Sequence, residues 1–426
     1  MPYRRYVLIV LTCVYTLNYL DRGLITLLLP SIQADLRLSD TQLGFLTGLA
    51  FGLFYAILGI PAARWSDRGD RSAITSLAIG LWGLTVMSCL YVGNFAQLVA
   101  ARVAAGVGEA GCMPPTYSLV GDYFPGPAER TRAISYYMLA SPLSVLLSFV
   151  LGGWLAAREG WRMTFFLMGM PALFVAALVR CTIRDPRGSM QGSPHVPQPL
   201  PRVHHVIADL WRRRATRHLT CAVILLLAMG AGLGPWYAAF LSRYHGLSTR
   251  SLGLSLGIIF SLGGLAGIAL GGYVGTRHFA HDERRQMQLT AGAAAALFPS
   301  FALFLLLRST SGALSALALL WVSFNFFMGP TFALLQRLVS AETRATSLAI
   351  LMMLANLIGM GLGPQIVGSL SDFLRPIVGA ASLRYAMLTL SFIALWAAYH
   401  FWRAGEAVGA DLEAVACLDA TRRSLA

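Results

Sequence analysis

The stretch TLNYLDRGLITLLLP, residues Thr16–Pro30, places two adjacent charges, Asp21 and Arg22, in largely apolar surroundings. Together with its flanks it forms an apolar run over 6–29, which is long enough for a helix that crosses a bilayer. A charge at the centre of such a helix costs about 2.5–3.5 kcal/mol on insertion scales, so charges there are usually retained for function. The stretch therefore predicts a membrane helix with functional charges of both signs.

The composition of the whole chain indicates a membrane protein. Its 426 residues are 56% hydrophobic and 12% charged, with a mean hydropathy of +0.63, whereas a soluble chain carries about 25% charged residues. Twelve apolar runs have the length of membrane-spanning helices. They lie at 6–29, 43–63, 72–92, 96–119, 132–157, 162–180, 218–241, 250–274, 286–307, 311–335, 345–370 and 382–402. We expect an all-α membrane protein whose first run is a retained helix rather than a signal peptide.

The distribution of basic residues predicts the orientation of these helices. All 33 basic residues are arginine, and the net charge is +14. If the N-terminus is cytoplasmic, 23 arginines fall in cytoplasmic segments and eight in the opposite loops. This asymmetry follows the positive-inside rule and predicts that both termini are cytoplasmic, in the inner (plasma) membrane. The basic run Asp209–Leu219 then flanks the seventh helix on the side of the anionic lipid surface, and we expect no nucleic-acid partner.

Repeats divide the predicted helices into two halves. Pro115-Thr116-Tyr117 resembles Pro330-Thr331-Phe332, and the segment from Ala128 to Ala133 resembles that from Ala341 to Ala345. The offset is about half the chain, and such duplication is typical of secondary transporters. A stretch rich in proline and glycine separates the halves. The expected parts are a six-helix bundle over 1–180, a linker with a basic segment over 181–217, a second six-helix bundle over 218–403 and a cytoplasmic tail over 404–426.

Motifs for other classes of function are weak. The six cysteines and eight histidines show no paired spacing, so we expect no disulfide framework, metal site or cofactor. Gly106, Gly108 and Gly111 match the G-x-G-x-x-G pattern of dinucleotide sites, but they lie inside an apolar helical run. We therefore expect these glycines to allow close helix packing instead. Glycines at 359, 361 and 363, followed by Pro364, are expected to loosen the eleventh helix.

Several motifs resemble the major facilitator superfamily. The segment ARWSDRGDR, Ala63–Arg71, resembles its loop between helices two and three, and RVAAGVGEAG, Arg102–Gly111, resembles its helix-four motif. NYLDR in the first helix and NLIGMGLGP, Asn356–Pro364, resemble the Spinster-type transporters, which are associated with lysolipid and sphingoid-phosphate cargo. Proton-coupled organic-anion symporters share the first-helix stretch. Ala63 departs from the expected leading glycine of the loop, and the second copy has Thr276 where an aspartate would stand.

Four charges at membrane depth are the candidate working residues. Asp21 and Glu109 are the candidate proton carriers, because a buried carboxylate beside an arginine changes its proton affinity as its surroundings change. Arg22 and Arg102 are candidates for holding an anionic group of the substrate. Arg102 and Glu109 lie two helical turns apart and share a face. The structural alternative is that one pair, Arg102 with Glu109, only fastens the fourth helix to its neighbours.

Other candidate residues lie around this set. Asn18, Tyr19, Asn325 and Asn356 are expected to contribute to substrate binding. Asp67, Arg68 and Arg71 are expected to form a gate latch between the halves, or else to serve only as topogenic charge.

The resemblance and the charges together imply a monomeric proton-coupled secondary transporter that works by alternating access, not an enzyme. Its expected partners are protons, membrane lipids and a substrate that is an exported or exchanged amphiphilic, lipid-like anion. The alternative substrate is a small hydrophilic organic anion taken up by symport.

Overall fold

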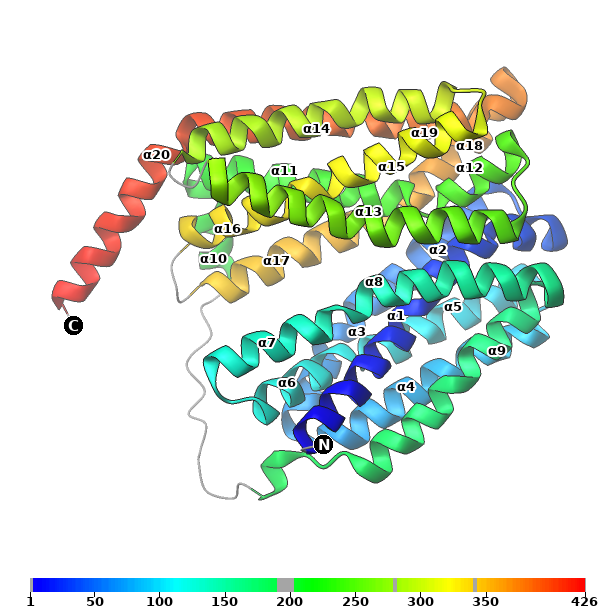
Figure 1. The fold of residues 1–426 in the computed structure, drawn as a ribbon, viewed down its shortest axis with the longest axis horizontal. Helices are drawn as coiled ribbons and strands as arrows, with labels where there is room; N and C mark the ends of the chain where they lie inside the picture. The colour runs from blue at the N-terminus through cyan, green and yellow to red at the C-terminus, as the bar shows by residue number, and fades with distance from the viewer. Residues whose placement is uncertain (1–2, 190–202, 279–281, 340–342, 426) are drawn as a thin grey trace. The chain divides into compact units, whose positions relative to one another are not determined.

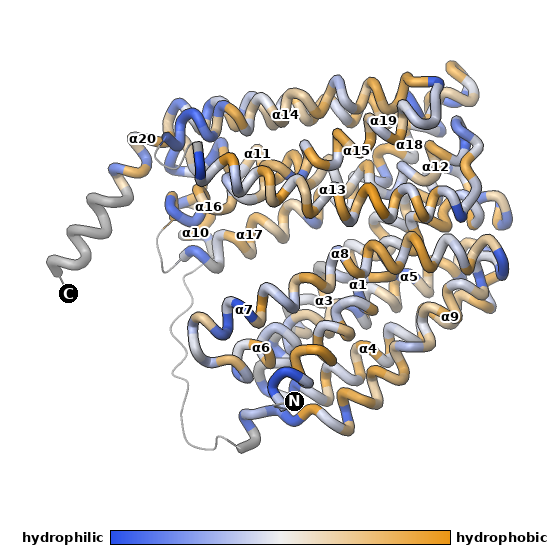
Figure 2. Tube along the Cα trace, in the orientation of Figure 1, coloured by the Kyte–Doolittle hydropathy of each residue, from blue (hydrophilic) through white to orange (hydrophobic). Residues whose placement is uncertain are grey.

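Every regular element that the structure describes is a helix, as the sequence predicts. The structure, a computed structural model, describes residues 3–189, 203–278, 282–339 and 343–425 (Figure 1). Apolar residues run along the helices and hydrophilic residues gather mainly near their ends (Figure 2). This distribution is expected of helices that cross a bilayer.

The twelve predicted spans all fall on helices. Within the described residues, nine helical segments are long and apolar enough to cross a membrane. Two of these, Pro127–Thr182 and Thr346–Ala414, each contain two predicted spans. The predicted span at 96–119 is absent from the nine because a break at Gly111 and Cys112 divides it between two shorter helices.

Internal contacts divide the chain into two compact units. The first unit comprises Met1–His195, Gly234–Ser261 and Pro364–Phe373, and the second comprises Val196–Leu233, Leu262–Gly363 and Leu374–Ala426. The first unit thus includes two segments from the second half of the sequence. The domain bounds expected from the sequence stay a prediction.

The first unit is built around packing of α4 against α9, with α1 against α8 and α9, and α5 against α3 and α4. Its elements are α1 (Tyr3–Leu36), α2 (Asp40–Thr47), α3 (Leu49–Arg68), α4 (Arg71–Ser88), η1 (Cys89–Tyr91), α5 (Phe95–Ala110), α6 (Met113–Tyr123), α7 (Pro127–Met138), α8 (Ala140–Leu146), η2 (Leu147–Leu151), α9 (Gly152–Thr182), η3 (Pro186–Ser189), α12 (Trp236–His245), the first part of α13 (Thr249–His278) and the middle of α18 (Gly363–Val378).

The second unit is built around α20, which packs against α11 and α14. Its elements are α10 (Val203–Arg212), α11 (Arg214–Leu233), the rest of α13, α14 (Glu283–Leu306), α15 (Thr310–Phe326), α16 (Met328–Leu338), α17 (Arg344–Asn356), η4 (Leu357–Leu362), the ends of α18, η5 (Gly379–Ala381), α19 (Ser382–Ser391) and α20 (Ile393–Leu425).

Local signals explain where several helices begin and bend. Ser39 and Gln42 form a capping box at the start of α2, and the Asp70 side chain accepts hydrogen bonds from the first backbone amides of α4. Gly160, with φ of 75°, allows the sharp turn within α9 that separates the fifth and sixth predicted spans.

The glycines of the G-x-G-x-x-G match serve helix packing, as predicted. A Cβ atom on Gly108 would lie 2.9 Å from the backbone nitrogen of Trp82, and one on Gly106 would lie 3.1 Å from the carbonyl oxygen of Phe51. The missing side chains therefore let α5 approach α3 and α4 closely. This contact places the polar face of α5 against α1.

The eleventh predicted span is also shaped by its glycines. Its middle forms the π-helix η4, and a Cβ atom on Gly359 or Gly363 would lie within 2.6 Å of α11 backbone atoms. The predicted loosening and close approach of this span are therefore confirmed.

The sequence repeat has a structural counterpart. The motifs at Pro115 and Pro330 both lie at the start of an eleven-residue helix, α6 and α16. Residues 341 and 342 of the second repeat, and 190–202 of the predicted linker, lie outside the described residues.

Candidate functional site

The four charges at membrane depth form two ion pairs between α1 and α5. The Nε atom of Arg22 donates to Oε1 of Glu109 at 2.7 Å, and Nη1 of Arg102 donates to Oδ2 of Asp21. Asp21 and Glu109 are each 1% exposed, and Arg102 is 4% exposed. We call these four residues the charge quartet. Arg102 is paired with Asp21 and not with Glu109, so the pairing assumed in the structural alternative is wrong.

Aromatic rings surround the arginines of the quartet. The guanidinium carbon of Arg22 lies 4.5 Å from the ring centre of Tyr19 and 4.9 Å from that of Tyr55. The ring centre of Phe51 is close to both arginines, 5.2 Å from the guanidinium carbon of Arg22 and 4.9 Å from that of Arg102. Such cation–π contacts favour a partly desolvated cation by about 0.5–2 kcal/mol each. The two arginines of the quartet therefore pack against aromatic rings, which we call the apolar wall.

Several polar atoms of this region are buried without a hydrogen-bond partner among the described residues. They are both amide atoms of Asn18, Nε of Arg102 and Oε2 of Glu109. An unsatisfied buried polar group costs about 1–3 kcal/mol, so such groups cluster where another molecule binds or a proton moves. The quartet and Asn18 thus present donors and acceptors to a polar group.

The remaining predicted binding residues lie in the second unit. Asn325 is 9% exposed, and its amide nitrogen donates to the carbonyl oxygen of Trp321 at 2.8 Å. Asn356 is exposed at the end of α17. Thr331, which the sequence also offers as a polar group of the second half, is buried with a hydroxyl that has no partner among the described residues. The binding roles of Asn325 and Asn356 stay predictions.

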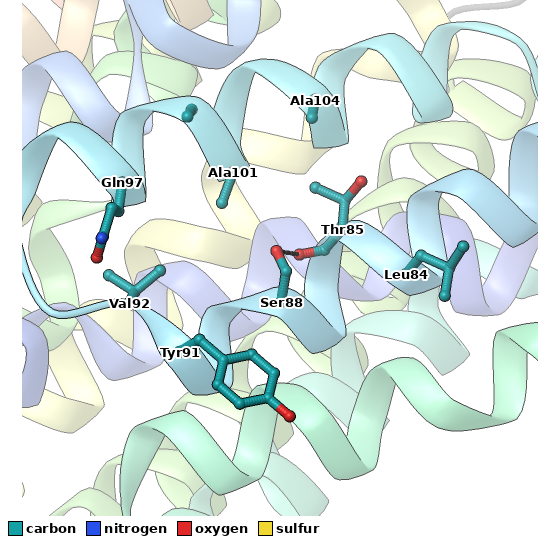
Figure 3. Close-up of a pocket in the computed structure, with 9 residues that line it drawn as sticks. Leu84, Thr85, Ser88, Tyr91, Val92, Gln97, Ala101 and Ala104 are labelled. Atoms are coloured by element: carbon teal, nitrogen blue, oxygen red, sulfur yellow. Dashed lines mark hydrogen bonds between the residues drawn. The ribbon is translucent and has the colours of Figure 1, made fainter.

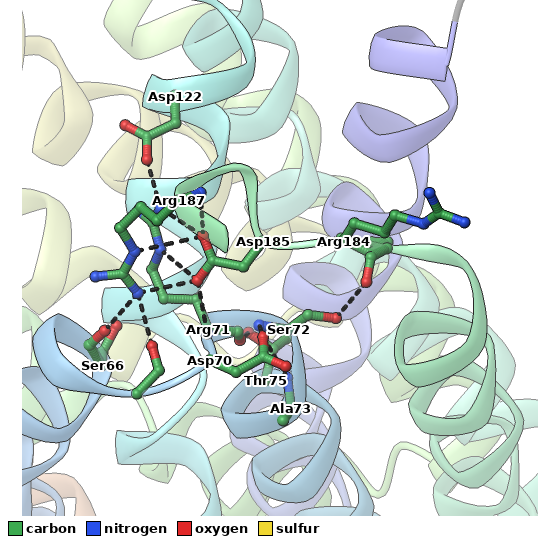
Figure 4. Close-up of polar contacts among 12 residues, drawn as sticks. Ser66, Asp70, Arg71, Ser72, Ala73, Thr75, Asp122, Arg184, Asp185 and Arg187 are labelled. Atoms are coloured by element: carbon green, nitrogen blue, oxygen red, sulfur yellow. Dashed lines mark hydrogen bonds and ion pairs between the residues drawn. The ribbon is translucent and has the colours of Figure 1, made fainter. Parts of the chain in front are cut away.

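Arg71, a predicted gate residue, is bound within the first unit. Its Nη2 atom donates to Oδ1 of Asp185 at 2.9 Å and also contacts Asp122 (Figure 4). These two contacts join α4 to α6 and to the segment that follows α9. Burial raises the pKa of Asp185, but hydrogen bonds from Arg71 and Arg187 outweigh it, and the pKa lies well below its usual value. Arg68 is exposed. The Asp67 side chain lies outside the described residues, and the gate role stays a prediction.

A second ionic cluster in the first unit was missed by sequence reasoning. Asp40, fully buried at the start of α2, accepts hydrogen bonds from Arg243 of α12 at 2.9 Å and from Ser371 of α18 at 2.7 Å. Asp372 accepts a bond from the backbone amide of Thr41 at 2.7 Å. The capping box predicts the start of α2, but no local signal pairs Asp40 with residues more than 200 positions away.

A surface pocket between α4 and α5 offers no charge. It encloses about 470 Å³, and its lining includes Thr85, Ser88, Gln97, Ala101 and Ala104 (Figure 3). The Ser88 hydroxyl donates to the carbonyl oxygen of Thr85 at 2.7 Å, so it has no further hydrogen to donate to a ligand. With no charged residue in its lining, this pocket is not suited to an anion.

Known proteins resemble this chain over most of its length. An MFS-type efflux pump of Mycolicibacterium smegmatis is 31% identical over 404 residues, covering 95% of this chain and 93% of the relative. A hexuronate transporter of Bacillus subtilis is 25% identical and covers 89% and 90%. The crystal structure of a bacterial homolog of the human lysosomal transporter Spinster, inward-facing and unoccupied, is similar with a TM-score of 0.85 at 27% identity, covering 96% of this chain and 98% of that one.

The family model of the Major Facilitator Superfamily matches residues 11–364, which contain the whole charge quartet. The fold and the predicted resemblance to Spinster transporters are thereby confirmed. The chain belongs to the Major Facilitator Superfamily of multi-pass membrane transporters and is not an enzyme.

Proposed function

We propose that this transporter is proton-coupled, works by alternating access and exports or exchanges an amphiphilic, lipid-like anion across the inner membrane, with both termini cytoplasmic. The observation that carries the proposal is the charge quartet, two buried ion pairs between α1 and α5 beside unpaired polar atoms. A permanent dry ion pair gives a protein little stability, because desolvation offsets the attraction. Two such pairs at membrane depth are better explained by a role in transport than by a contribution to stability.

The coupling step follows from the charge balance of the quartet. Protonation of Asp21 or Glu109 neutralises one carboxylate and leaves one guanidinium without its counter-charge. An anionic substrate group then replaces the lost charge and binds the same arginine. When the carboxylate loses its proton, it competes for the arginine again and the anion is released. Proton binding to the carboxylate and anion binding to its arginine are thus linked.

The surroundings of Arg22 favour an amphiphile. Its guanidinium carbon lies 4.5–5.2 Å from the ring centres of Tyr19, Phe51 and Tyr55, and its Nε atom donates to Glu109. An anionic head can bind the arginine while an apolar body packs on the rings, and each buried CH₂ contributes about 0.8 kcal/mol. The likeness to an efflux pump supports export, and the resemblance of the sequence motifs to Spinster-type transporters implies a lipid-like cargo.

A small hydrophilic organic anion is the second candidate. The similarity to a hexuronate transporter favours it, since a sugar acid also carries one carboxylate. This candidate needs the arginines but makes no use of the apolar wall.

Transport by the purified chain in proteoliposomes with an imposed pH gradient distinguishes the two. We expect single-chain amphiphilic anions to be transported and their affinity to rise stepwise with chain length. Arg22→Gln should weaken charged amphiphiles at least about tenfold, because a hydrogen bond to a charged group is worth about 1.5–3 kcal/mol, and it should hardly affect neutral ones. Arg308→Gln, an exposed arginine outside the quartet, is the matched control. Stronger binding of sugar acids than of every amphiphile would overturn the lipid-like substrate.

A further inference from the structure

A second pocket of the first unit is lined largely by arginine. It encloses about 710 Å³, a volume in the range of small-molecule sites. The charged residues of its lining are Arg68, Asp70, Arg180, Arg184, Asp185 and Arg187. We call it the arginine pocket.

Both acids of the arginine pocket already have partners. Asp70 accepts the backbone amide of Ser72 at 2.9 Å, where it caps α4. Asp185 accepts from Arg71 and from Arg187, and Arg71 also contacts Asp122, so these two arginines have two carboxylates as counter-charges (Figure 4). Both carboxylates of the lining therefore make structural contacts within the protein.

Three arginines of the pocket keep their charge available. Arg68, Arg180 and Arg184 are exposed, and no carboxylate pairs with their guanidinium groups among the side chains that the structure describes. In Figure 4 the Arg184 side chain extends away from Asp185. Arginine presents parallel N–H donors that match the oxygens of a phosphate group. The chemistry of the pocket is thus that of a phosphate site.

The arginine pocket lies where membrane-spanning segments end. The apolar segment containing α9 ends at Thr182, between Arg180 and Arg184, and the segment of α4 begins at Arg71. The Tyr3 hydroxyl of α1 donates to the carbonyl oxygen of Thr182 at 2.7 Å, which brings the start of α1 to the same border. Lipid phosphates occupy this depth, and basic pockets between helices at this level bind anionic headgroups.

We propose that the arginine pocket binds the phosphate headgroup of an anionic membrane lipid such as phosphatidylglycerol. This site is distinct from the charge quartet and does not depend on the identity of the transported substrate. The lipid holds together the end of α3, the loop that precedes α4 and the end of α9, whose residues line the pocket.

Lipid titration of the full-length protein tests the proposal. Nanodiscs of phosphatidylcholine are supplemented with phosphatidylglycerol, and bound lipid is counted by native mass spectrometry. Replacing Arg180 and Arg184 together by glutamine should weaken phosphatidylglycerol binding about 30-fold, since each arginine near the lipid surface contributes about 1 kcal/mol. The matched control replaces two exposed arginines outside the pocket, Arg250 and Arg308, by glutamine. An equal loss in both double variants would show general charge attraction and overturn the proposal.

Cys181 provides a second measurement on the unaltered chain. This cysteine is exposed and belongs to the pocket lining. Phosphatidylglycerol should slow its reaction with a bulky maleimide, whereas phosphatidylcholine should not. Inorganic phosphate and glycerol 3-phosphate are the soluble comparisons. If either protects Cys181 as well as phosphatidylglycerol does, or if no phosphate compound protects it, the assignment to a membrane lipid is refuted.

Discussion

The Asp21–Arg102 pair allows the coupling proposal to be tested with one substitution. Asp21→Asn keeps the shape of the side chain but removes its charge, so it imitates a permanently protonated carboxyl. Arg102, 4% exposed, would then keep a positive charge without its partner. Removing one member of a buried ion pair costs about 3–5 kcal/mol. We expect the lower end of this range, because the amide oxygen can still accept one hydrogen bond from Arg102.

A control on the same helix separates burial from charge. Asp35 pairs with Arg162 at 2.6 Å, but their side chains are 44% and 32% exposed. Asp35→Asn should therefore reduce the free energy of unfolding by at most about 1 kcal/mol. Adding Arg102→Gln to Asp21→Asn should recover most of the lost stability, since no uncompensated charge then remains in the pair.

Two assays decide the outcome. Denaturant unfolding in detergent measures stability, and uptake into proteoliposomes against a concentration gradient measures coupling. We expect Asp21→Asn to abolish gradient-driven uptake while substrate binding survives, and the double variant to stay uncoupled although its stability recovers. Undiminished uphill transport by Asp21→Asn would remove Asp21 from the coupling role.

Three further outcomes are expected. Asp40→Asn should weaken the contacts that join α2, α12 and α18, so distances between labels on these helices should lengthen; an unchanged distribution would contradict this. Because the pKa of Asp185 is lowered on folding, its contribution to stability is present above its ordinary pKa of 3.8 and is lost as the pH falls through the lower folded value. Asp185→Asn should therefore lower the melting temperature at pH 7 and lose this effect on strong acidification, whereas a pH-independent difference would refute the charge argument. Gly108→Ala brings a methyl group within 2.9 Å of Trp82 and should cost about 1–3 kcal/mol, while Gly121→Ala, which has open space, should cost nothing measurable.

The sequence predicts the helices well because their signal is local. An apolar run of about 20 residues has few alternatives to a membrane helix, since every backbone group must be paired inside the bilayer. The repeat adds a long-range constraint, and α6 and α16 do begin at matching motifs. The break at Gly111 and Cys112 has a local cause as well, because Pro114 and Pro115 stand at the start of α6 and cannot donate the backbone hydrogen bonds that would continue α5.

The partners of the buried charges were less predictable. Helical periodicity places Arg102 and Glu109 on one face of α5, and the structure confirms that both meet α1. Helical periodicity does not specify how α1 is rotated against that face of α5. This rotation decides which acid pairs with which arginine. The Asp40–Arg243 pair was harder still, because only the folded first unit brings these residues together.

Helix α1 connects three polar clusters of the first unit. Near its start, Tyr3 binds Thr182; in its middle, Asp21 belongs to the quartet; near its end, the Gln33 amide donates to Asp40 at 3.0 Å. The helix has 34 residues and spans about 50 Å. In the proposed cycle, a proton on Asp21 loosens α1 from α5 at its midpoint. Because the helix is continuous, a shift there must change the contacts at both of its ends, and this is the coupling that alternating access requires.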